Sequence, residues 1–500
     1  MSDTTLRVPK QTELPMQNGN PAHSHVLRGR ILGLALLSAA ALFMENLDAT
    51  IMATGLPAMA RDFGVTPVAL NVGITAYLLA LAVFIPISGW MAGRFGERRV
   101  FASAVLIFTV ASVFCGVSRN LPAFLLSRIL QGLGGSMMVP VGRLMLVRAV
   151  TKPQLMGAIA YTIWPALTAP ILGPVVGGYI LHVASWPWMF LLNVPIGVVL
   201  FVVSLFLVRD SAERSTEPLD GTGYLLVVAS CLLLMLGLER VQMTNNRFQG
   251  SLLQAAVAVA ASAGMAAIAA WHMRRVSRPL FQMEVFRIKS FRTVIGSGSL
   301  FRMAVFSAPF LLPLLFQTSF GLDALRSGSL VTAVFAGNLA MKPLTTPILR
   351  RFGFRLVLLG NGVATVLLLA ACGWLRVGTS TWLVLIVLFL GGAGRSMEFT
   401  ALTTLGFADL PLELTNSGTT LITVVQQMTV SVGIAVAALT LQWSTHLGHA
   451  VGDFRITFLV MSGIAAVSLP AFYKLPHDAG AAVNRPQRLR SEQNWSGSSK

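Results

Sequence analysis

The feature that most constrains the fold is a succession of apolar segments that runs through nearly the whole chain. An α-helix rises ~1.5 Å per residue, so about 20 apolar residues cross the ~30 Å hydrocarbon layer of a bilayer. Lipid offers the backbone no hydrogen-bond partners, so each such segment is expected to be a helix. The sequence therefore predicts an all-α membrane protein with fourteen spans, near 31–54, 70–91, 100–118, 121–147, 155–181, 188–208, 222–239, 251–272, 291–317, 325–348, 355–375, 380–405, 416–442 and 455–475.

The distribution of charge predicts how the chain is oriented in the membrane. Only 11% of the 500 residues are charged, against about 25% in soluble domains. The net charge of +18 does not indicate a nucleic-acid-binding surface, because the basic residues lie in short segments between apolar windows. The two tails and the connecting segments on the same side of the predicted membrane carry 25 Lys and Arg residues, and the segments on the opposite side carry 7. The positive-inside rule then predicts a multi-pass protein with both termini cytoplasmic; we expect its membrane to be a cell (inner) membrane of the bacterial type.

A short internal repeat predicts the domain organisation. The pattern Arg-Phe-Gly-x-Arg at 94–98 recurs at 351–355, an offset of 257 residues, and both copies fall between consecutive spans. The repeat pairs a first group of six spans with a last group of six. Two parallel six-helix repeats around a central site are typical of secondary transporters. We predict an N-terminal tail at 1–30, a six-helix bundle at 31–208, two inserted helices with their loops at 209–290, a second bundle at 291–475 and a C-terminal tail at 476–500.

Two acids in the first span indicate proton or cation chemistry. Glu45 and Asp48 are the only charged residues between 31 and 54, and their spacing of three places them on one helix face. An acid within the bilayer costs roughly 2.5–3.5 kcal/mol on insertion scales, so it usually faces a cavity or a partner. Arg128 in the fourth span has the same predicted depth as Asp48. We therefore expect these opposite charges to pair, which lowers the cost of both.

Four segments together resemble the fourteen-span drug:proton antiporter family of the major facilitator superfamily, and the resemblance extends along nearly all of residues 31–475. It implies the major facilitator fold, two six-helix bundles plus two extra central transmembrane helices. It also implies that Asp48 and Arg128 take part in proton coupling, and we expect Glu45 to serve as the second acid. The segments are the first-helix motif at 47–57, the loop motif at 89–99, the arginine motif at 128–135 and the antiporter motif at 173–178.

In the loop motif, the resemblance implies that Gly89 and Gly96 permit a tight turn between antiparallel helices. It also implies that Arg94 and Arg98 latch an inner gate against the other half. This chain has Gly93 where the family usually has Asp. The charge relay attributed to that Asp is therefore in doubt here.

The antiporter motif is carried by exporters of the superfamily, and importers generally lack it. Gly173 and Gly177 continue from Ala169 as a ridge of small residues that allows close helix approach. Pro174, between Gly173 and Gly178, removes a backbone hydrogen bond and bends the helix. We expect this ridge to face the opposing half. A packing ridge without a role in export is the alternative.

Candidate substrate-cavity residues lie in both halves. Arg302, Arg395 and Glu398 are charged residues within predicted spans, so each is a functional candidate. Arg395 and Glu398 are three residues apart, and an internal salt bridge without a ligand role is equally compatible with that spacing. Gln131 and Trp164 could line a cavity, although packing is the more frequent role of an amide or aromatic side chain in a span.

These observations predict a secondary transporter that exports small amphipathic compounds in exchange for protons. The sequence has no Gly-rich phosphate loop of the kind that binds ATP, and no cluster of residues has the spacing of metal ligands. The expected energy source is the proton gradient, without a cofactor. The expected partners are small-molecule substrates and the lipid bilayer, not nucleic acid, and we expect no enzyme activity. Oligomeric state is not indicated. The alternatives are a transporter of one metabolite, such as a sugar or siderophore, with the same fold, or a transport-inactive membrane sensor.

Overall fold

The computed structural model describes residues 29–150, 152–209, 218–243, 248–446 and 454–476, which form helices and connecting turns. The long helices are α1 (Arg30–Phe63), α2 (Val72–Phe95), α3 (Glu97–Val117), α4 (Leu121–Ala149), α5 (Lys152–Val183), α7 (Asn193–Leu207), α8 (Gly221–Met243), α9 (Phe248–Met273), α13 (Ala324–Cys372), α14 (Thr381–Ala408), α15 (Thr415–His446) and α16 (Phe454–Ala466). The shorter ones are η1 (Ala69–Asn71), α6 (Pro187–Leu191), η2 (Met283–Arg287), α10 (Lys289–Ile295), α11 (Ser297–Val305), α12 (Ala308–Leu314), η3 (Leu315–Ser319), η4 (Leu412–Leu414) and α17 (Leu469–Tyr473).

Twelve helical segments of the described residues are long and apolar enough to cross a bilayer. One of them, α13, has 49 residues and is two helices joined at Gly353, whose backbone is not helical. At ~1.5 Å per residue it is more than twice as long as the ~30 Å hydrocarbon layer is thick. Helix α8 adds a shorter apolar stretch, Gly221–Gly237. The count of fourteen spans and the domain boundaries stay predictions, and most of the predicted tails lie outside the described residues.

Three predicted spans are interrupted where the sequence expectation was one continuous helix. The span expected at 188–208 is divided between α6 and α7, the one at 291–317 among α10, α11 and α12, and the one at 455–475 between α16 and α17. Three of the four breaks lie within three residues before a proline, Pro195, Pro309 or Pro470, and the fourth lies at Gly296. Proline has no N–H to continue the helical ladder, and its ring clashes with the preceding turn.

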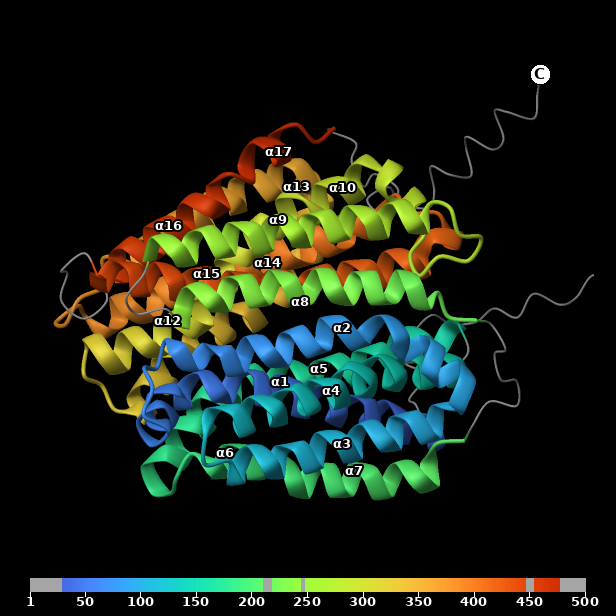
Figure 1. The fold of residues 1–500 in the computed structure, drawn as a ribbon, viewed down its shortest axis with the longest axis horizontal. Helices are drawn as coiled ribbons and strands as arrows, with labels where there is room; N and C mark the ends of the chain where they lie inside the picture. The colour runs from blue at the N-terminus through green and yellow to red at the C-terminus, as the bar shows by residue number, and fades with distance from the viewer. Residues whose placement is uncertain (1–28, 151, 210–217, 244–247, 447–453, 477–500) are drawn as a thin grey trace, which may run out of the picture.

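The first and last parts of the chain form two neighbouring groups of nearly parallel helices. Figure 1 shows α1 to α7 on one side and α13 to α17 on the other, with α8 between them and α9 beside it. Helix α5 packs on α13, α2 packs on α15, and α8 contacts both α2 and α15. Helix α8 therefore covers one line along which the two groups meet, and α9 packs on α8. Helices α5, α13, α2 and α15 form the contact between the groups.

The inserted helices are tied together by polar contacts near the start of α8. Nε2 of His272 lies 3.0 Å from Oδ1 of Asp220, and the same Oδ1 accepts a hydrogen bond from the backbone N–H of Gly223. The backbone N–H of Leu280 donates to Oδ2 of Asp220. Burial raises the pKa of Asp220, but these hydrogen bonds lower it by more than burial raises it. The pKa of Asp220 therefore lies below its usual value. Farther along the pair, the Ser262 hydroxyl donates to the Ser230 carbonyl at 2.8 Å. These bonds fix α8 against α9.

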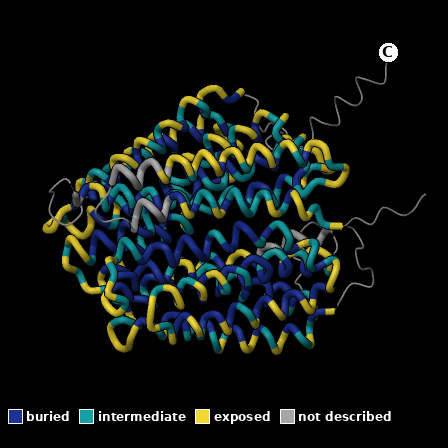
Figure 2. The backbone as a smooth tube through the Cα atoms, in the orientation of Figure 1, coloured by how far each residue is buried: buried dark blue, intermediate teal, exposed yellow. Residues whose placement is uncertain are grey.

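Burial follows the pattern of a protein surrounded by lipid. Figure 2 shows buried residues concentrated between helices and exposed residues on their outward faces. Large apolar side chains such as Phe206 and Trp382 are among the exposed ones, at 84% and 76%, as expected where the surrounding medium is hydrocarbon. Polar groups show the opposite behaviour, because Asp48 and Arg128 are both fully buried. These two opposite charges therefore lie inside the helix bundle and not at its surface.

The internal repeat has the same backbone conformation in its two copies. Gly96, between α2 and α3, has φ 95° and ψ 142°, and Gly353, within α13, has φ 74° and ψ 164°. Side chains with a Cβ rarely adopt this region of backbone space. The Arg-Phe-Gly pattern is thus a turn signal in both halves of the chain.

Candidate functional site

Asp48 lies at the centre of a hydrogen-bonded network inside the first group of helices. Its Oδ2 atom is 2.6 Å from Nη1 of Arg128 on α4. Its Oδ1 atom accepts hydrogen bonds from Nε2 of Gln131 at 2.8 Å and from Nδ2 of Asn193 at 3.1 Å. The predicted pairing of Asp48 with Arg128 is confirmed. Helices α1, α4 and α7 each contribute a side chain, so the network connects three spans.

Arg128 is also held by groups other than its counter-ion. Its Nε donates to the carbonyl of Gly73 at 3.2 Å, and Nη1 also donates to Oε1 of Gln131. Its guanidinium carbon lies 4.4 Å from the centroid of the Tyr77 ring. Gln131 in turn donates to the hydroxyl of Ser112 at 2.9 Å. Gln131, predicted as a cavity residue, therefore belongs to the buried network, because its amide fills the space between Asp48 and Ser112.

Two adjoining cavities lie between the groups of helices. The Glu45 chamber, about 220 Å³, is lined on one side by Glu45, Tyr77 and Arg128 and on the other by phenylalanines of the last part of the chain. The Arg302 chamber, about 270 Å³, lies beside it and shares with it Asn46, Pro170, Phe306, Phe335, Arg395, Gln427 and Val430. Typical ligand sites have volumes of about 300–1,000 Å³. Each chamber alone is smaller than that, and the two together fall within this range.

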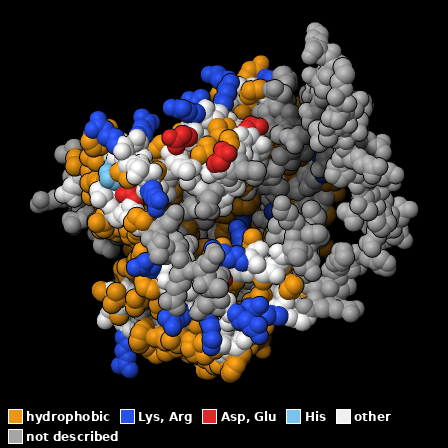
Figure 3. Space-filling view, turned by 90° about the vertical axis from the view of Figure 1, so that its right-hand side faces the viewer, with side chains coloured by type: hydrophobic (Ala, Val, Ile, Leu, Met, Phe, Trp, Pro, Cys, Tyr) orange, Lys and Arg blue, Asp and Glu red, His pale blue; other side chains and the backbone are white. Residues whose placement is uncertain are grey.

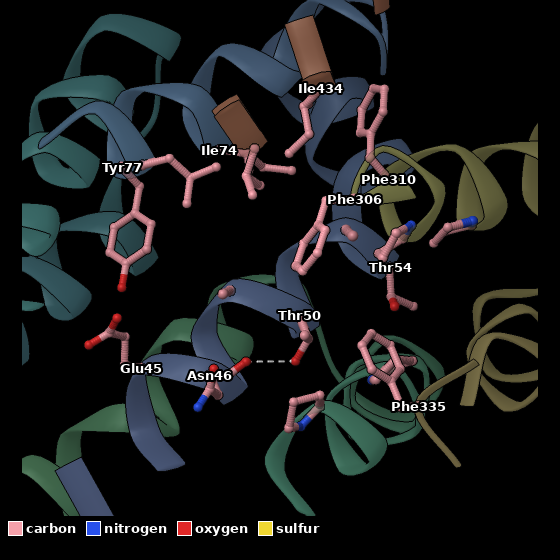
Figure 4. Close-up of a pocket in the computed structure, with 18 of the residues that line it drawn as sticks. Glu45, Asn46, Thr50, Thr54, Ile74, Tyr77, Phe306, Phe310, Phe335 and Ile434 are labelled. Carbon is pink, nitrogen blue, oxygen red and sulfur yellow. Dashed lines mark hydrogen bonds between the residues drawn. The ribbon is translucent and has the colours of Figure 1, made fainter. Parts of the chain in front are cut away.

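Glu45 reaches the cavity directly, whereas Asp48 does not line it. Figure 4 shows the Glu45 carboxylate and the Tyr77 hydroxyl pointing toward one another at one side of the chamber, with Phe306 and Phe335 farther across it. Oε2 of Glu45 and the Tyr77 hydroxyl are both buried without a hydrogen-bond partner. The two acids of α1 thus have different surroundings, although they are three residues apart.

The second half contributes cations to the cavity walls. Arg302 on α11, Lys342 on α13 and Arg395 on α14 all line the Arg302 chamber, and Arg395 lines the Glu45 chamber as well. Arg302 and Arg395 were predicted as cavity residues. Lys342 was not predicted, although a lysine within a predicted span was a sufficient signal.

Glu398 does not form the salt bridge with Arg395 that was one reading of their spacing. Its Oε2 accepts a hydrogen bond from Nδ2 of Asn361 at 2.7 Å, and its Oε1 has no partner. It lines a small pocket together with Arg302 and Arg395, but it lines neither chamber. Its assignment to the substrate cavity is therefore wrong for this structure. The partner of its carboxylate is thus an amide of α13 and not the arginine of its own helix.

Trp164 is 53% exposed and lines none of the described pockets. It lies on α5 six residues before Pro170, which does line both chambers. Six residues correspond to about 240° around the helix axis after one full turn, so the indole does not face the same wall. The prediction that Trp164 lines the substrate cavity is not supported by its position.

The small residues of α5 lie on two faces of the helix, and each face contacts a different helix. A Cβ added to Gly177 would lie 2.9 Å from Cγ1 of Ile51, and one added to Gly173 would collide with the side chain of Thr50. These two glycines therefore pack on α1 in the same half, and the expectation that they face the opposing half is wrong. Ala169 is buried as well. Periodicity identifies a ridge of small residues but not the neighbour that it meets.

The contact with the opposing half is made by the next residues of the same motif. A Cβ on Gly178 would lie 2.6 Å from the carbonyl oxygen of Ala324 on α13. A Cβ on Gly328 would collide with the carbonyl oxygen of Pro174. Each helix thus presents a glycine to a carbonyl group of the other. Pro174 lies inside α5, where its ring removes one backbone hydrogen bond.

The loop motif is only partly a turn. Gly96 makes the turn, but Gly89 lies within α2, and an added Cβ there would meet nothing within 4 Å; its predicted role in the turn is wrong. Arg94 and Arg98 are exposed. Glu97 forms an ion pair with Arg148 of α4, Nη1 to Oε1 at 2.5 Å. That ion pair lies within the first half and does not reach the other half.

Sequence reasoning missed Asn193 and Ser112, which complete the network around Asp48. Both are fully or almost fully buried, and the Asn193 amide also lies 3.5 Å from the Ser112 hydroxyl. Polar side chains within apolar spans were the available signal, because a buried amide or hydroxyl requires a partner. The sequence did not indicate which partner each would meet.

Comparison with known proteins identifies the family. The family model described as "Major Facilitator Superfamily" matches residues 38–434 and 295–497. Together with the helical architecture, this match shows that the chain belongs to the Major Facilitator Superfamily of membrane transporters.

Curated relatives match over nearly their whole length. Proteins named "Putative multidrug resistance protein MdtD" from Klebsiella pneumoniae (strain 342) and Shigella flexneri are each 34% identical to this chain. Each alignment covers 90% of this chain and 96% of the relative. The whole transporter core is therefore shared, and not one bundle alone.

Solved structures with a similar fold are much more distant in sequence. A mutant of the nucleoside transporter NupG and a D-xylose-proton symporter each superpose with a TM-score of 0.64 at 14% identity. They cover 89% and 90% of this chain and 99% of their own. The POT family transporter PepTSo has a TM-score of 0.66 at 13% identity and covers 89% of this chain and 96% of its own. These likenesses concern the fold alone.

Proposed function

We propose that the protein exports small amphipathic compounds across a bacterial-type inner membrane in exchange for protons. The observation that carries this proposal is the buried Asp48–Arg128 ion pair beside a cavity that both halves of the chain line. The apolar and aromatic walls of the chambers fit amphipathic compounds. The names of the curated relatives, which refer to multidrug resistance, support the same substrate class.

Protonation of Asp48 and its ion pair with Arg128 exclude one another. All contacts that the structure gives to the Asp48 oxygens are donated by nitrogen atoms, of Arg128, Gln131 and Asn193. A proton on the carboxyl replaces one of these donors and removes the charge that neutralises Arg128. The guanidinium must then find another acceptor, and it already lines the Glu45 chamber. In this way one proton changes the cavity wall.

Glu45 serves as the second acid in this proposal. It lines the chamber, so its carboxylate is accessible to a cationic or hydrogen-bond-donating group of a substrate as well as to a proton. Competition between the two is the physical basis of exchange, because only interactions that differ between two states can shift their populations. In this proposal, the protonation state of Asp48 determines whether Arg128 has a counter-ion, and Glu45 binds either the substrate or a proton in the chamber.

Both termini are assigned to the cytoplasm in this proposal. Figure 3, which views the right-hand end of Figure 1, shows Lys and Arg side chains gathered over that end. A basic end supports a cytoplasmic assignment by the positive-inside rule. Backbone contacts between the halves involve Gly178 near the end of α5 and Ala324 at the start of α13, which lie at the opposite end. With this orientation, the halves are closed toward the outside.

Purified protein in liposomes with an imposed pH gradient tests the proposal. Transport of a panel of cationic, neutral and zwitterionic aromatic compounds is followed together with luminal pH. We expect gradient-driven transport in the wild type and in Asp62→Asn, an acid on the same helix that accepts a hydrogen bond from Trp186 outside the network. We expect loss of gradient dependence in Asp48→Asn and in Glu45→Gln. Gradient-driven transport that survives both substitutions would show that these acids do not couple the proton.

Reporter fusions test the orientation separately. Fusions after Val208 and after Arg275 flank the inserted helices, and both are expected to report a cytoplasmic location. An outward location at only one of them would mean that α8 and α9 do not cross the membrane as a pair. Outward locations at both would reverse the orientation.

A further inference from the structure

The charges around the joined chambers are separated by sign. Glu45 is the only Asp or Glu among the described residues that line either chamber. At the other side, Arg302, Lys342 and Arg395 line the Arg302 chamber. Arg128 also lines the Glu45 chamber, but Asp48 neutralises it at 2.6 Å. One carboxylate therefore faces three cations across a space with aromatic walls.

The cations lack the partners that a protein normally supplies for buried charge. Nε and Nη2 of Arg302 and Nε and Nη1 of Arg395 are buried without a hydrogen-bond partner, and Arg302 is only 3% exposed. Lys342 donates to the neutral hydroxyl of Thr400 at 3.2 Å. Glu398, the acid three residues after Arg395, accepts a hydrogen bond from Asn361 instead. Burying a charge without a counter-ion costs several kcal/mol, so this wall has the chemistry of an anion-binding surface.

Aromatic rings hold the cations in position but do not neutralise them. The guanidinium carbon of Arg395 lies 4.4 Å from the centroid of Phe306, and that of Arg302 lies 5.5 Å from the centroid of Phe399. Nζ of Lys342 lies 5.8 Å from the same Phe399 ring. Cation–π contacts of this kind stabilise a buried charge less than its burial costs. The edges of the guanidinium groups stay available to an acceptor.

The opposite wall suits a cation or a proton. Oε2 of Glu45 is buried without a partner. A positively charged group of a ligand would satisfy it, and so would a proton. A purely cationic ligand leaves the three cations of the other wall unsatisfied and is repelled by them. A purely anionic ligand is repelled by Glu45 and cannot compete with its proton.

We propose that the preferred substrates are zwitterionic aromatic compounds. Their ammonium group binds Glu45, their carboxylate or other oxyanion binds Arg302 and Arg395 with Lys342 beside it, and their ring lies against Phe306 and Phe335. This inference rests on the proposed function and specifies its substrate class. It also accounts for exchange, because the ammonium group of the substrate and the proton compete for one carboxylate while the anionic group fixes the substrate in the cavity.

Four compounds with one naphthalene body test the charge requirement. They are 6-(aminomethyl)-2-naphthoate as the zwitterion, 2-naphthoate as the anion, 2-naphthylmethylamine as the cation and 2-naphthamide as the neutral compound. Equilibrium binding to the purified full chain in detergent at neutral pH is measured by calorimetry. We expect the zwitterion to bind at least about tenfold more tightly than each of the others, since each charged hydrogen bond contributes about 1.5–3 kcal/mol. Equal affinity for the cation or the neutral compound would overturn the proposal.

Variants separate the two walls. Glu45→Gln is expected to weaken the zwitterion about tenfold, to the level of the anion, and to leave 2-naphthoate no weaker than before. Arg302→Gln is expected to weaken the zwitterion about tenfold, to the level of the cation, whereas Arg302→Lys retains most of the affinity. Arg376→Gln, at an exposed arginine in the turn after α13, is the matched control and is expected to bind all four compounds as the wild type does.

Arg395→Gln provides a second test of the cationic wall if Arg302→Gln does not fold, with thermal unfolding in detergent as the measure of folding. A zwitterion affinity unchanged in both folded Arg variants would overturn the proposal. Transport in liposomes distinguishes this failure from failure of the proposed function. If the cation is driven by a pH gradient and the zwitterion is not preferred, the substrate class is wrong and proton-coupled export stands. If the zwitterion binds as expected but no compound responds to the gradient, the site stands and the export function is wrong.

Discussion

The two halves of the chain bury charge in opposite ways. In the first half, Asp48 and Arg128 neutralise one another, and side chains from α3, α4 and α7 complete their hydrogen bonds. In the second half, Arg302 and Arg395 face aromatic rings and leave two nitrogens each without a partner. A charge that the protein itself satisfies holds the structure together or switches it. A charge that the protein leaves unsatisfied beside a cavity indicates a ligand.

The largest expected effect is the loss of one partner of the ion pair. Asp48→Asn leaves the fully buried Arg128 without a counter-ion, and breaking a buried pair costs about 3–5 kcal/mol. We expect a marked decrease in the unfolding temperature in detergent together with loss of transport. The double variant Asp48→Asn/Arg128→Gln removes both charges and is expected to recover much of the stability but not the transport. A double variant as unstable as the single one would show that the network, and not its charge balance, is decisive.

The next effect distinguishes packing within a half from packing between halves. Gly178→Leu places its side chain against the backbone of Ala324 across the halves, whereas Gly177→Leu places it against Ile51 in the same half. Overpacking costs about 1–3 kcal/mol in either case. Only Gly178→Leu is expected to separate the halves. Spin labels at Arg119 and Arg376, one in an exposed turn of each half, measure that separation.

The distance between these labels is therefore expected to lengthen in Gly178→Leu and to stay as in the wild type in Gly177→Leu, which is expected to lower only the unfolding temperature. A longer distance in both variants would mean that the ridge on α1 and the contact on α13 act as one unit. Unchanged distances in both would remove α5 from the contact that controls opening.

A smaller and symmetrical effect is expected at the two repeat turns. Gly96→Ala and Gly353→Ala each force a side chain into a backbone region that non-glycine residues rarely adopt, at a cost of about 1–2 kcal/mol. Gly360→Ala is the matched control, because Gly360 is helical with open space around it and alanine favours a helix. Thermal unfolding of the three variants measures the effect. Unequal losses at Gly96 and Gly353 would show that the two halves do not rely equally on this turn.

The smallest effect on stability is expected in the second half. Arg302→Met removes a buried charge that has no counter-ion, so the unfolding temperature is expected to stay close to that of the wild type or to rise. Arg128→Met, the corresponding change in the first half, leaves Asp48 uncompensated and is expected to cost about 3–5 kcal/mol. Similar losses in the two variants would contradict the contrast between satisfied and unsatisfied charge.

The sequence predicted which charges lie inside the bundle and one of their pairings. A charge in an apolar span is conspicuous, and equal depth from the helix ends is enough to match Asp48 with Arg128. Rotation about a helix axis is much harder to predict. Small residues at 169, 173 and 177 indicate a close contact, but only packing decides that Gly173 and Gly177 meet α1 and that Gly178 meets α13.

The hydrogen-bond partners of the neutral side chains could not be predicted from the sequence either. The amide of Gln131 donates to both Asp48 and Ser112, and its position in the network depends on these two acceptors together. Glu398 had an arginine three residues away, yet it binds an asparagine of another helix. Spacing along one helix gives the pairs that are possible, and the neighbouring helices select among them.

The paired glycine contacts of α5 and α13 have a mechanical consequence. Gly178 lies five residues before the end of α5 at Val183 and 26 residues after its start at Lys152. At ~1.5 Å per residue, these distances are about 8 Å and about 39 Å. If the helices rock about this point, α5 is a lever with unequal arms. A displacement of about 1 Å at the end of the short arm then becomes about 5 Å at the end of the long arm. Small displacements at the closed end are therefore amplified about fivefold at the opposite opening.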